Sequence, residues 1–105
     1  MPTYISLLRF TQKGIHTIKD APAQLDDAKE FFKKMGADLK QYYLVMGQYD
    51  AIAIAEVPDD ETVAKLALAI GNAGYVQSQT FRAFNENEYR KIIDALVSEG
   101  VFEDT

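Results

Sequence analysis

The chain has 105 residues, is 48% hydrophobic and carries a formal net charge of −5. Its length suits one compact domain over residues 1–105 and is too short for a second core. Eleven Lys and Arg residues among sixteen acids do not supply the clustered cations that nucleic acid or an anionic membrane requires, so we expect neither partner. The absence of cysteine excludes disulfides, thiol nucleophiles and cysteine-metal sites, and fits a reducing cytoplasm.

The first predicted element is a strand over residues 3–10, which is rich in β-formers and apolar on both faces. A strand of this kind is covered on both sides, as in the centre of a sheet. With Arg9 in it and no long apolar run after it, this opening predicts neither a signal peptide nor a transmembrane span. We expect a soluble, cytoplasmic protein.

The first predicted helix follows a break at residues 11–14 and has Pro22 near its start, where a helix tolerates proline. Its apolar residues recur at helical spacing, and they are Leu25, Ala28, Phe32 and Met35. Gly36 is predicted to end it as the residue that follows the last helical turn.

A β-hairpin is predicted next, with strands over residues 38–46 and 49–57 around Gly47 and Gln48. A two-residue type II′ turn requires positive φ at its first central residue, and glycine adopts that value without steric cost. In this register Met46 lies opposite Tyr49, Val45 opposite Asp50 and Tyr42 opposite Ala53.

The second half repeats the alternation of helix and strand. Pro58 stops the hairpin strand, and Asp59 or Asp60 caps a helix whose buried stripe comprises Val63, Leu66, Ala67 and Ile70. Gly71 and Gly74 are predicted to end this helix, before a more polar edge strand over residues 75–84. Asn85 followed by Glu88 predicts the start of a third amphipathic helix, and residues 98–105 form an acidic, flexible tail.

This element order predicts an α+β fold, the ferredoxin-like βαββαβ arrangement with an added C-terminal helix. A right-handed crossover places strand 3–10 beside strand 49–57 and leaves strands 38–46 and 75–84 at the edges. Two helices then cover one face of the sheet. Because the two central strands are apolar on both faces, a second copy of the chain is expected to cover the other, giving a homodimer or a higher homo-oligomer.

The hairpin register sorts its side chains onto two faces. One face holds Tyr42, Leu44, Met46, Tyr49, Ala51, Ala53 and Ala55, and the other holds Gln41, Tyr43, Val45, Asp50, Ile52 and Ile54. The alanines leave room either for a closely packed helix or for a cavity.

Several of these segments together resemble the GYD domain family. The likeness covers about residues 3–95 and is carried by residues 10–15, the motif Gly47-Gln48-Tyr49-Asp50 with the strand that follows it, and residues 75–84. The motif has one inserted residue, Gln48. The resemblance implies a dimeric α+β barrel, and a looser likeness to the effector-binding domains of leucine-responsive regulators implies small metabolites bound between subunits.

The candidate ligand-binding residues are Tyr42, Tyr49, Asp50, His16 and Lys19. Asp50 can bind a ligand amine, but a carboxylate near a turn more often accepts hydrogen bonds from the backbone. Tyr42 and Tyr49 can line a pocket or form a cross-strand aromatic pair. His16 and Lys19 lie one helical turn apart and can bind a phosphate or carboxylate, although a lone histidine in a polar segment is usually only solvated.

No metal and no cofactor are expected, because the chain has one histidine and its paired aspartates stand at helix starts. No phosphate-binding glycine loop and no nucleophile with its base can be assembled. We therefore predict a homodimeric small-molecule-binding or assembly module. The alternative is a cofactor-independent enzyme, of monooxygenase or isomerase type, acting on a small organic substrate in the barrel cavity.

Overall fold

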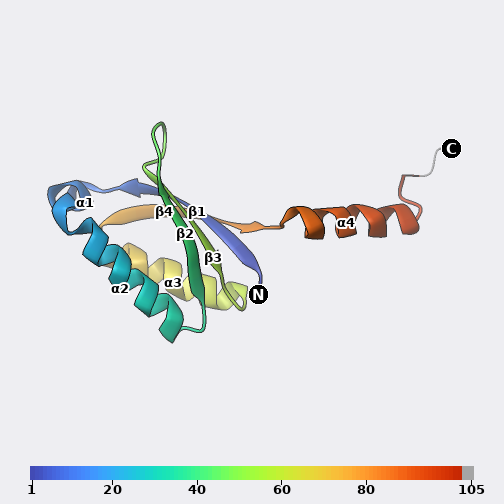
Figure 1. The fold of residues 1–105 in the computed structure, drawn as a ribbon, viewed down its shortest axis with the longest axis horizontal. Helices are drawn as coiled ribbons and strands as arrows, with labels where there is room; N and C mark the ends of the chain where they lie inside the picture. The colour runs from blue at the N-terminus through green and yellow to red at the C-terminus, as the bar shows by residue number, and fades with distance from the viewer. Residues whose placement is uncertain (103–105) are drawn as a thin grey trace.

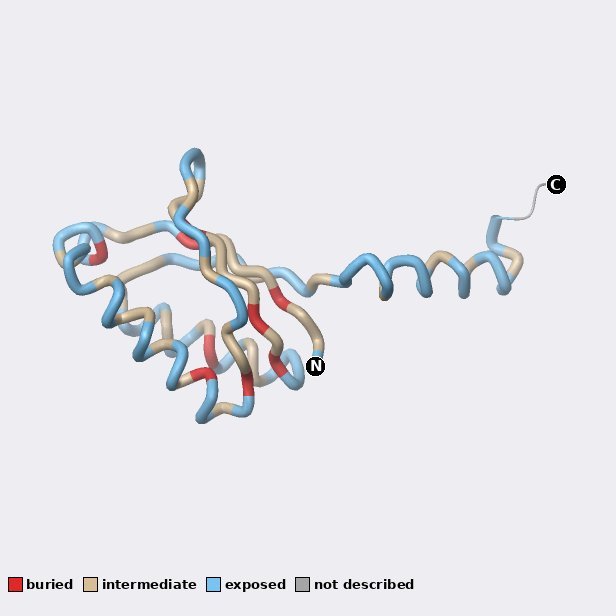
Figure 2. The backbone as a smooth tube through the Cα atoms, in the orientation of Figure 1, coloured by how far each residue is buried: buried red, intermediate tan, exposed pale blue. Residues whose placement is uncertain are grey.

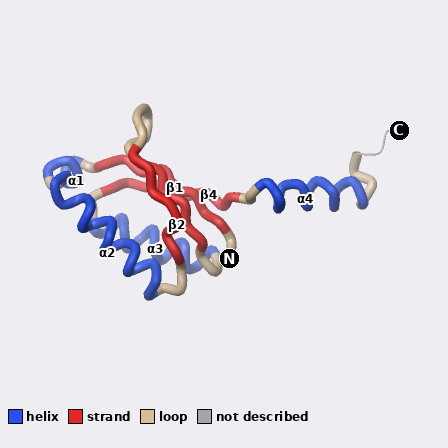
Figure 3. Tube along the Cα trace, viewed as in Figure 1, coloured by secondary structure: helices blue, strands red, loops and turns tan. Residues whose placement is uncertain are grey.

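The computed structural model describes residues 1–102, which form a mixed α+β fold with one four-stranded antiparallel sheet (Figure 3). The elements, in chain order, are β1 (Thr3–Phe10), α1 (Gln12–His16), the short 3-10 helix η1 (Ile18–Asp20), α2 (Ala21–Lys34), β2 (Asp38–Leu44), β3 (Ala51–Glu56), α3 (Asp60–Ala73), β4 (Val76–Ala83) and α4 (Glu86–Ser98).

The strands lie in the order β2-β3-β1-β4, and every neighbouring pair is antiparallel. As the sequence predicted, β1 lies beside β3, and β2 and β4 are at the edges. Ser6, in the middle of β1, pairs with Ala53 on β3 and with Thr80 on β4. A bulge between Leu39 and Gln41 interrupts the pairing of β2.

Helices α2 and α3 both lie on one side of the sheet (Figure 1). The buried apolar cluster is on this side, and it comprises Tyr4, Phe32, Ala37, Ala55, Val57 and Leu66. Figure 2 shows buried positions in the sheet, in α1 and around α2 and α3, and none in α4. The core predicted from the stripes of the two helices is confirmed at Phe32 and Leu66, the most buried residues of α2 and α3.

No described element covers the opposite side of the sheet (Figure 1). The alternation of the strands places a second apolar set there, which we call the open face: Ile5, Leu7, Ile52, Ile54, Tyr43 and Phe81. Ile5 pairs with both Ile54 and Phe81, so these side chains are neighbours across three strands. Tyr43 and Phe81 on the edge strands are about half exposed.

The two ends of α3 depend on its flanking residues. Asp59 caps the N-terminus, where its carboxylate accepts a hydrogen bond from the Thr62 N–H at 2.8 Å. Gly74 follows the helix with a left-handed φ of 85°. The prediction that Gly71 also ends this helix is wrong, because Gly71 lies inside α3, where a glycine lowers helix stability without stopping the helix.

The hairpin has shorter strands than predicted. The pairing of β2 with β3 ends at Leu44 and Ala51, so residues 45–50 form the loop of the hairpin. The predicted two-residue turn is therefore wrong. One further hydrogen bond, from the Val45 N–H to the Asp50 carbonyl at 2.9 Å, joins the two ends of this loop. The regular pairing of β2 with β3 stops here because the Asp50 N–H donates a hydrogen bond to the Leu8 carbonyl of β1. This bond attaches Asp50 to β1. Gly47 has a φ of 128°.

The short helix α1 begins within the segment predicted as a break at residues 11–14 and continues to His16. Thr11 caps it by accepting a hydrogen bond from the Gly14 N–H at 3.0 Å, and its hydroxyl donates to the Gly74 carbonyl at 2.6 Å. The bond from Thr11 to Gly74 connects the end of β1 to the end of α3. The helix was missed because one turn is too short for a periodic pattern.

The third predicted helix is α4, and its capping box between Asn85 and Glu88 is present. It does not pack on the sheet but extends away from it along the long axis of the molecule (Figure 1). None of its residues is buried. Of the tail predicted for residues 98–105, Ser98 is helical, residues 99–102 form a turn, and residues 103–105 lie outside the described part of the chain.

Candidate functional site

An apolar cavity of about 410 Å³ lies between the sheet and the helices α2 and α3. Its floor is formed by the helix-facing side chains of β1 and β3, and its walls by the inner faces of the two helices. The volume lies in the range of small-molecule sites, which are typically about 300–1,000 Å³. The cavity is therefore the candidate binding site of this fold.

Small side chains create this space. Ala53 and Ala55 on β3, Ser6 on β1, Ala28 on α2 and Ala67 on α3 all line it. A sheet and a helix layer are held apart by their larger side chains, so small residues facing one another leave a gap. Of the two alternatives for the alanines of the hairpin, a closely packed helix or a cavity, the structure shows the cavity.

Hydroxyl groups supply most of the hydrogen-bonding capacity inside the cavity. The hydroxyls of Ser6 and Thr80, neighbours on β1 and β4, lie 2.8 Å apart and hydrogen bond to each other. Tyr42 lines the cavity from β2. Burial raises the pKa of the Tyr42 phenol, and the negative charge of Asp50 raises it further. At neutral pH this phenol is therefore protonated and available as a hydrogen-bond donor.

Tyr4 closes the cavity near the start of α3. Its hydroxyl donates a hydrogen bond to the carboxylate of Asp60 in the first turn of that helix. This bond is the main reason that the pKa of Tyr4 is raised. The Arg82 guanidinium lies 5.8 Å from the centre of the Tyr4 ring. Tyr4 therefore joins the sheet to α3, and its role is to hold the two layers of the cavity together.

Asp50 is held by the backbone of β1. Its Oδ2 accepts a hydrogen bond from the Phe10 N–H at 2.8 Å, and its own N–H donates to the Leu8 carbonyl at 2.8 Å. From the sequence, Asp50 was expected either to accept hydrogen bonds from backbone N–H groups of the turn or to bind a ligand. The structure provides a backbone partner, but on the neighbouring strand.

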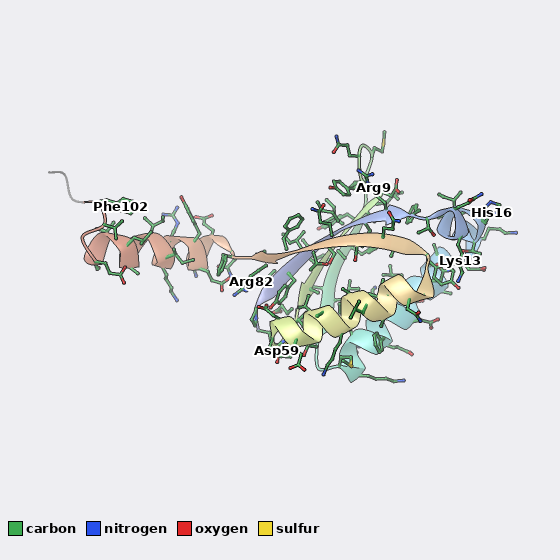
Figure 4. All side chains as sticks on the ribbon, turned by 180° about the vertical axis from the view of Figure 1, so that it is seen from behind. Arg9, Lys13, His16, Asp59, Arg82 and Phe102 are labelled. Carbon is green, nitrogen blue, oxygen red and sulfur yellow. The ribbon has the colours of Figure 1, made fainter. Side chains whose placement is uncertain are left out.

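Tyr49 lies on the open face of the sheet, so its placement on one face with Tyr42 is wrong. Its hydroxyl donates to the Gln79 side chain at 2.9 Å, and the Arg9 guanidinium lies 5.0 Å from its ring centre. Figure 4 shows Arg9 on the side of the sheet away from α3. The cause is the wide loop, which removes Tyr49 from the β3 alternation. The cross-strand pair of Tyr42 and Tyr49 is therefore excluded.

The sequence matches the GYD domain family over residues 4–93, which includes the sheet except Thr3, the cavity and the first eight of the thirteen residues of α4. The chain belongs to the GYD domain family. This confirms the resemblance carried by the hairpin motif. No solved structure matches the chain.

A curated relative of this GYD protein comes from Thermus thermophilus. It is named glutamine synthetase and cystathionine beta-lyase binding protein. The two are 31% identical over 84 residues, which cover 79% of this chain and 88% of the relative. The name of the relative describes a protein that binds other proteins.

His16 and Lys19 of this GYD domain do not join the cavity. His16 ends α1 and Lys19 lies in η1, and both side chains are exposed. Figure 4 shows His16 at the outer end of the domain, far from Arg82 where β4 ends. In the part of the chain that the structure describes, neither residue has a side-chain hydrogen bond or ion pair. The structure therefore does not bring them together with Tyr42, Tyr49 and Asp50.

No group of three or more His, Cys, Asp and Glu side chains in residues 1–102 is placed to hold a metal ion. No helix in this range is long and apolar enough to cross a membrane.

Four residues of the cavity and its rim are not among the candidates predicted from the sequence: Ser6, Thr80, Tyr4 and Asp60. Ser6 and Tyr4 could have been predicted, because the alternation of side chains along β1 places Tyr4, Ser6 and Leu8 on one face of the sheet. Predicting that the Ser6 and Thr80 hydroxyls meet requires the register of β1 with β4. These strands are far apart in the sequence, and their residue patterns do not determine that register.

Proposed function

We propose that this GYD protein is a non-enzymatic binding module that holds a small, neutral and largely apolar molecule in the cavity beneath α2 and α3. The observation that carries the proposal is the cavity itself, an apolar space of about 410 Å³ with a few hydroxyl groups on its floor. Such a site suits a ring or short chain with one hydrogen-bonding group. The Tyr42 phenol, protonated at neutral pH, is the proposed donor to that group.

The module is proposed to work as a homodimer in which a second copy covers the open face. The open face presents Ile5, Leu7, Ile52 and Ile54 in its centre, and monomers rarely expose contiguous apolar patches of this kind. The strand order supports the finer proposal of a ferredoxin-like domain over residues 1–105. Two such sheets facing each other would form a dimeric α+β barrel.

Binding of other proteins is proposed as the purpose of the dimer. The support is the relative in Thermus thermophilus, whose name states that it binds two enzymes. A small ligand in the cavity would then report a metabolite level to the bound partner. A cytoplasmic location is proposed with it, supported by the absence of cysteine.

Catalysis, the alternative drawn from the sequence, receives less support. An isomerase or monooxygenase without a cofactor needs a group that removes a proton from its substrate. Burial and Asp50 raise the pKa of Tyr42, which makes its phenol a poor base at neutral pH. Asp50 is already bonded to the backbone of β1. The catalytic role therefore stays the second hypothesis.

The cavity is tested with a neutral apolar fluorophore, N-phenylnaphthylamine, whose emission rises in an apolar site. Ala53→Leu places a larger side chain in the cavity, and Ala64→Leu adds the same atoms on the exposed side of α3. We expect the parent and Ala64→Leu to bind the probe and Ala53→Leu to lose it. Equal binding by all three proteins would contradict the proposal.

The homodimer is tested separately by sedimentation at micromolar concentration. Ile54→Lys places a charge in the centre of the open face, and Ala64→Lys places the same charge on α3. The parent and Ala64→Lys should sediment as dimers, and Ile54→Lys as a monomer. A parent that sediments as a stable monomer would exclude the dimer.

A further inference from the structure

Within residues 1–102, the C-terminal helix α4 packs against no other helix or strand. It projects from the end of β4 and its far end lies well outside the rest of the molecule (Figures 1 and 4). The radius of gyration is 17.0 Å, whereas a compact chain of this length has about 13 Å. An ion pair between Arg82 and Glu88, 4.0 Å apart, links its first turn to β4.

The exposed helix nevertheless has a complete apolar stripe. Its members recur at helical spacing, and they are Tyr89, Ile92, Ile93, Leu96 and Val97. Tyr89 and Val97 are each 59% exposed. An isolated helix of thirteen residues is only marginally stable in water, because most helix stability in proteins comes from packing of the apolar face. The stripe therefore requires a partner surface.

We infer that α4 is an exchanged arm: in the homodimer, the α4 of each copy packs its apolar stripe against the other copy, along the rim of that copy's open face. The inference rests on the proposed homodimer and adds to it the element that completes the interface. The rim is formed by Tyr43 on β2 and Phe81 on β4, which are 51% and 45% exposed. These two residues lie at opposite edges of the sheet, and the arm is inferred to cover the edge at Tyr43.

The surface area identifies the occupant as a second copy. The chain exposes 7578 Å², about 1,700 Å² more than a compact monomer of this mass. Burial of that excess on both copies would give an interface of about 3,300 Å², within the range of obligate homodimers. An exchanged arm also brings the stripe of one copy onto the open face of the other. In a two-fold interface each copy makes the same contact with its partner, so both stripes and both open faces are covered.

The arm cannot reach its own open face in this conformation. Two residues, Phe84 and Asn85, join β4 to α4. Asn85 and Glu88 exchange hydrogen bonds in the capping box, at 2.8 and 3.0 Å, and these bonds fix the residue at which the helix begins. Because the helix extends away from the sheet (Figure 1) and none of its residues is buried, the stripe does not cover its own open face.

The first test measures self-association of the full chain by sedimentation over a dilution series. Ile93→Asp with Val97→Asp places two carboxylates in the stripe, whereas Ala95→Asp with Lys91→Asp places two on the polar side of the same helix. We expect the stripe variant to associate at least about 100-fold more weakly than the parent, since a buried, unpaired carboxylate is unfavourable. The polar-side variant should remain dimeric.

The second test locates the arm and does not depend on loss of folding. The chain has no cysteine, so Tyr43→Cys with Val97→Cys introduces a single pair of thiols per copy for a short bis-maleimide cross-linker. An exchanged arm gives a covalent dimer on a denaturing gel. The control, Tyr43→Cys with Ala95→Cys, should cross-link much less. A covalent monomer, or no cross-link at all, would overturn the inference.

These outcomes separate the arm from the homodimer. If the stripe variant remains as dimeric as the parent while Ile54→Lys is monomeric, the dimer stands and the exchanged arm is wrong. If the parent itself is monomeric, both fall. Dimerisation lost in the stripe variant together with a covalent dimer in the cross-linking test supports both.

Discussion

The carboxylate of Asp50 accepts a hydrogen bond from the backbone N–H of Phe10 at 2.8 Å, although forty residues separate them in the chain. The backbone N–H of Asp50 donates to the Leu8 carbonyl at the same distance. The last residue of the hairpin loop is thus bound to β1 through both its backbone and its side chain. This attachment explains why the ladder between β2 and β3 stops early and why Tyr49 lies on the open face.

Replacement of Asp50 distinguishes a structural carboxylate from a ligand-binding one. Asp50→Asn retains an acceptor for the Phe10 N–H and should change the free energy of unfolding little. Asp50→Ala leaves that N–H without a partner and should cost about 1–3 kcal/mol. Urea denaturation of the two variants and the parent measures the difference. An Asp50→Ala protein more stable than the parent, with a small molecule no longer retained, would instead make Asp50 a ligand-binding residue.

Gly47 should be intolerant of a side chain because of its backbone and not because of space. Its φ is 128°, and a Cβ at this position would have no atom within 4 Å. Gly47→Val should therefore destabilise the protein by about 1–3 kcal/mol through backbone strain. The control is Gly71→Ala in α3, also in open space but helical, which should stabilise by about 0.5–1 kcal/mol. Thermal unfolding with an unchanged Gly47→Val midpoint would contradict this.

Local patterns predicted most of the fold. The alternation of β1, the stripes of α2 and α3 and the capping box at Asn85 each depend on residues close together in the chain, so the sequence displays them directly. The neighbours of β1 followed from the handedness of crossovers, which is a general rule of connection.

The wrong predictions in the hairpin depended on contacts between distant residues. The hydrogen bonds of Asp50 with β1 widened the hairpin loop and moved Tyr49 to the other face, and no pattern within the hairpin indicates them. The position of α4 was likewise not predictable, because its stripe is the same whether it packs on its own sheet or on another copy. The cavity depended on how far α2 and α3 stand from the alanines of β3.

Gly14 should be the least replaceable glycine of the domain. It lies in α1 with an ordinary helical φ, but a Cβ there would be 2.1 Å from the backbone carbonyl oxygen of Tyr75. The same carbonyl accepts a hydrogen bond from the Thr11 N–H at 3.1 Å, so it cannot move without losing that bond. Gly14→Ala should therefore destabilise by about 1–3 kcal/mol, the usual cost of overpacking. Gln12→Ala, an exposed change in the same helix, should leave the unfolding midpoint unchanged.

The titration of Tyr42 should report the charge of Asp50. Burial is the main cause of the raised pKa of Tyr42, and the Asp50 carboxylate is the second. Asp50→Asn removes the charge but not the burial, so the pKa of Tyr42 should fall and remain above that of a free tyrosine. Alkaline titration of the absorbance at about 295 nm, where ionised phenols absorb, measures it, and Tyr42→Phe identifies its contribution among the six tyrosines.

The same pKa fixes the sign of the pH dependence of stability. A phenol whose pKa is higher in the folded state than in the unfolded state contributes stability that is fully present below the unfolded value of about 10. This contribution is lost as the pH rises through the folded value. The alkaline loss of stability should thus be smaller in Asp50→Asn than in the parent, while Glu61→Gln, an exposed change on α3, should match the parent. An unaltered Tyr42 pKa in Asp50→Asn would show that the charge of Asp50 does not reach the cavity.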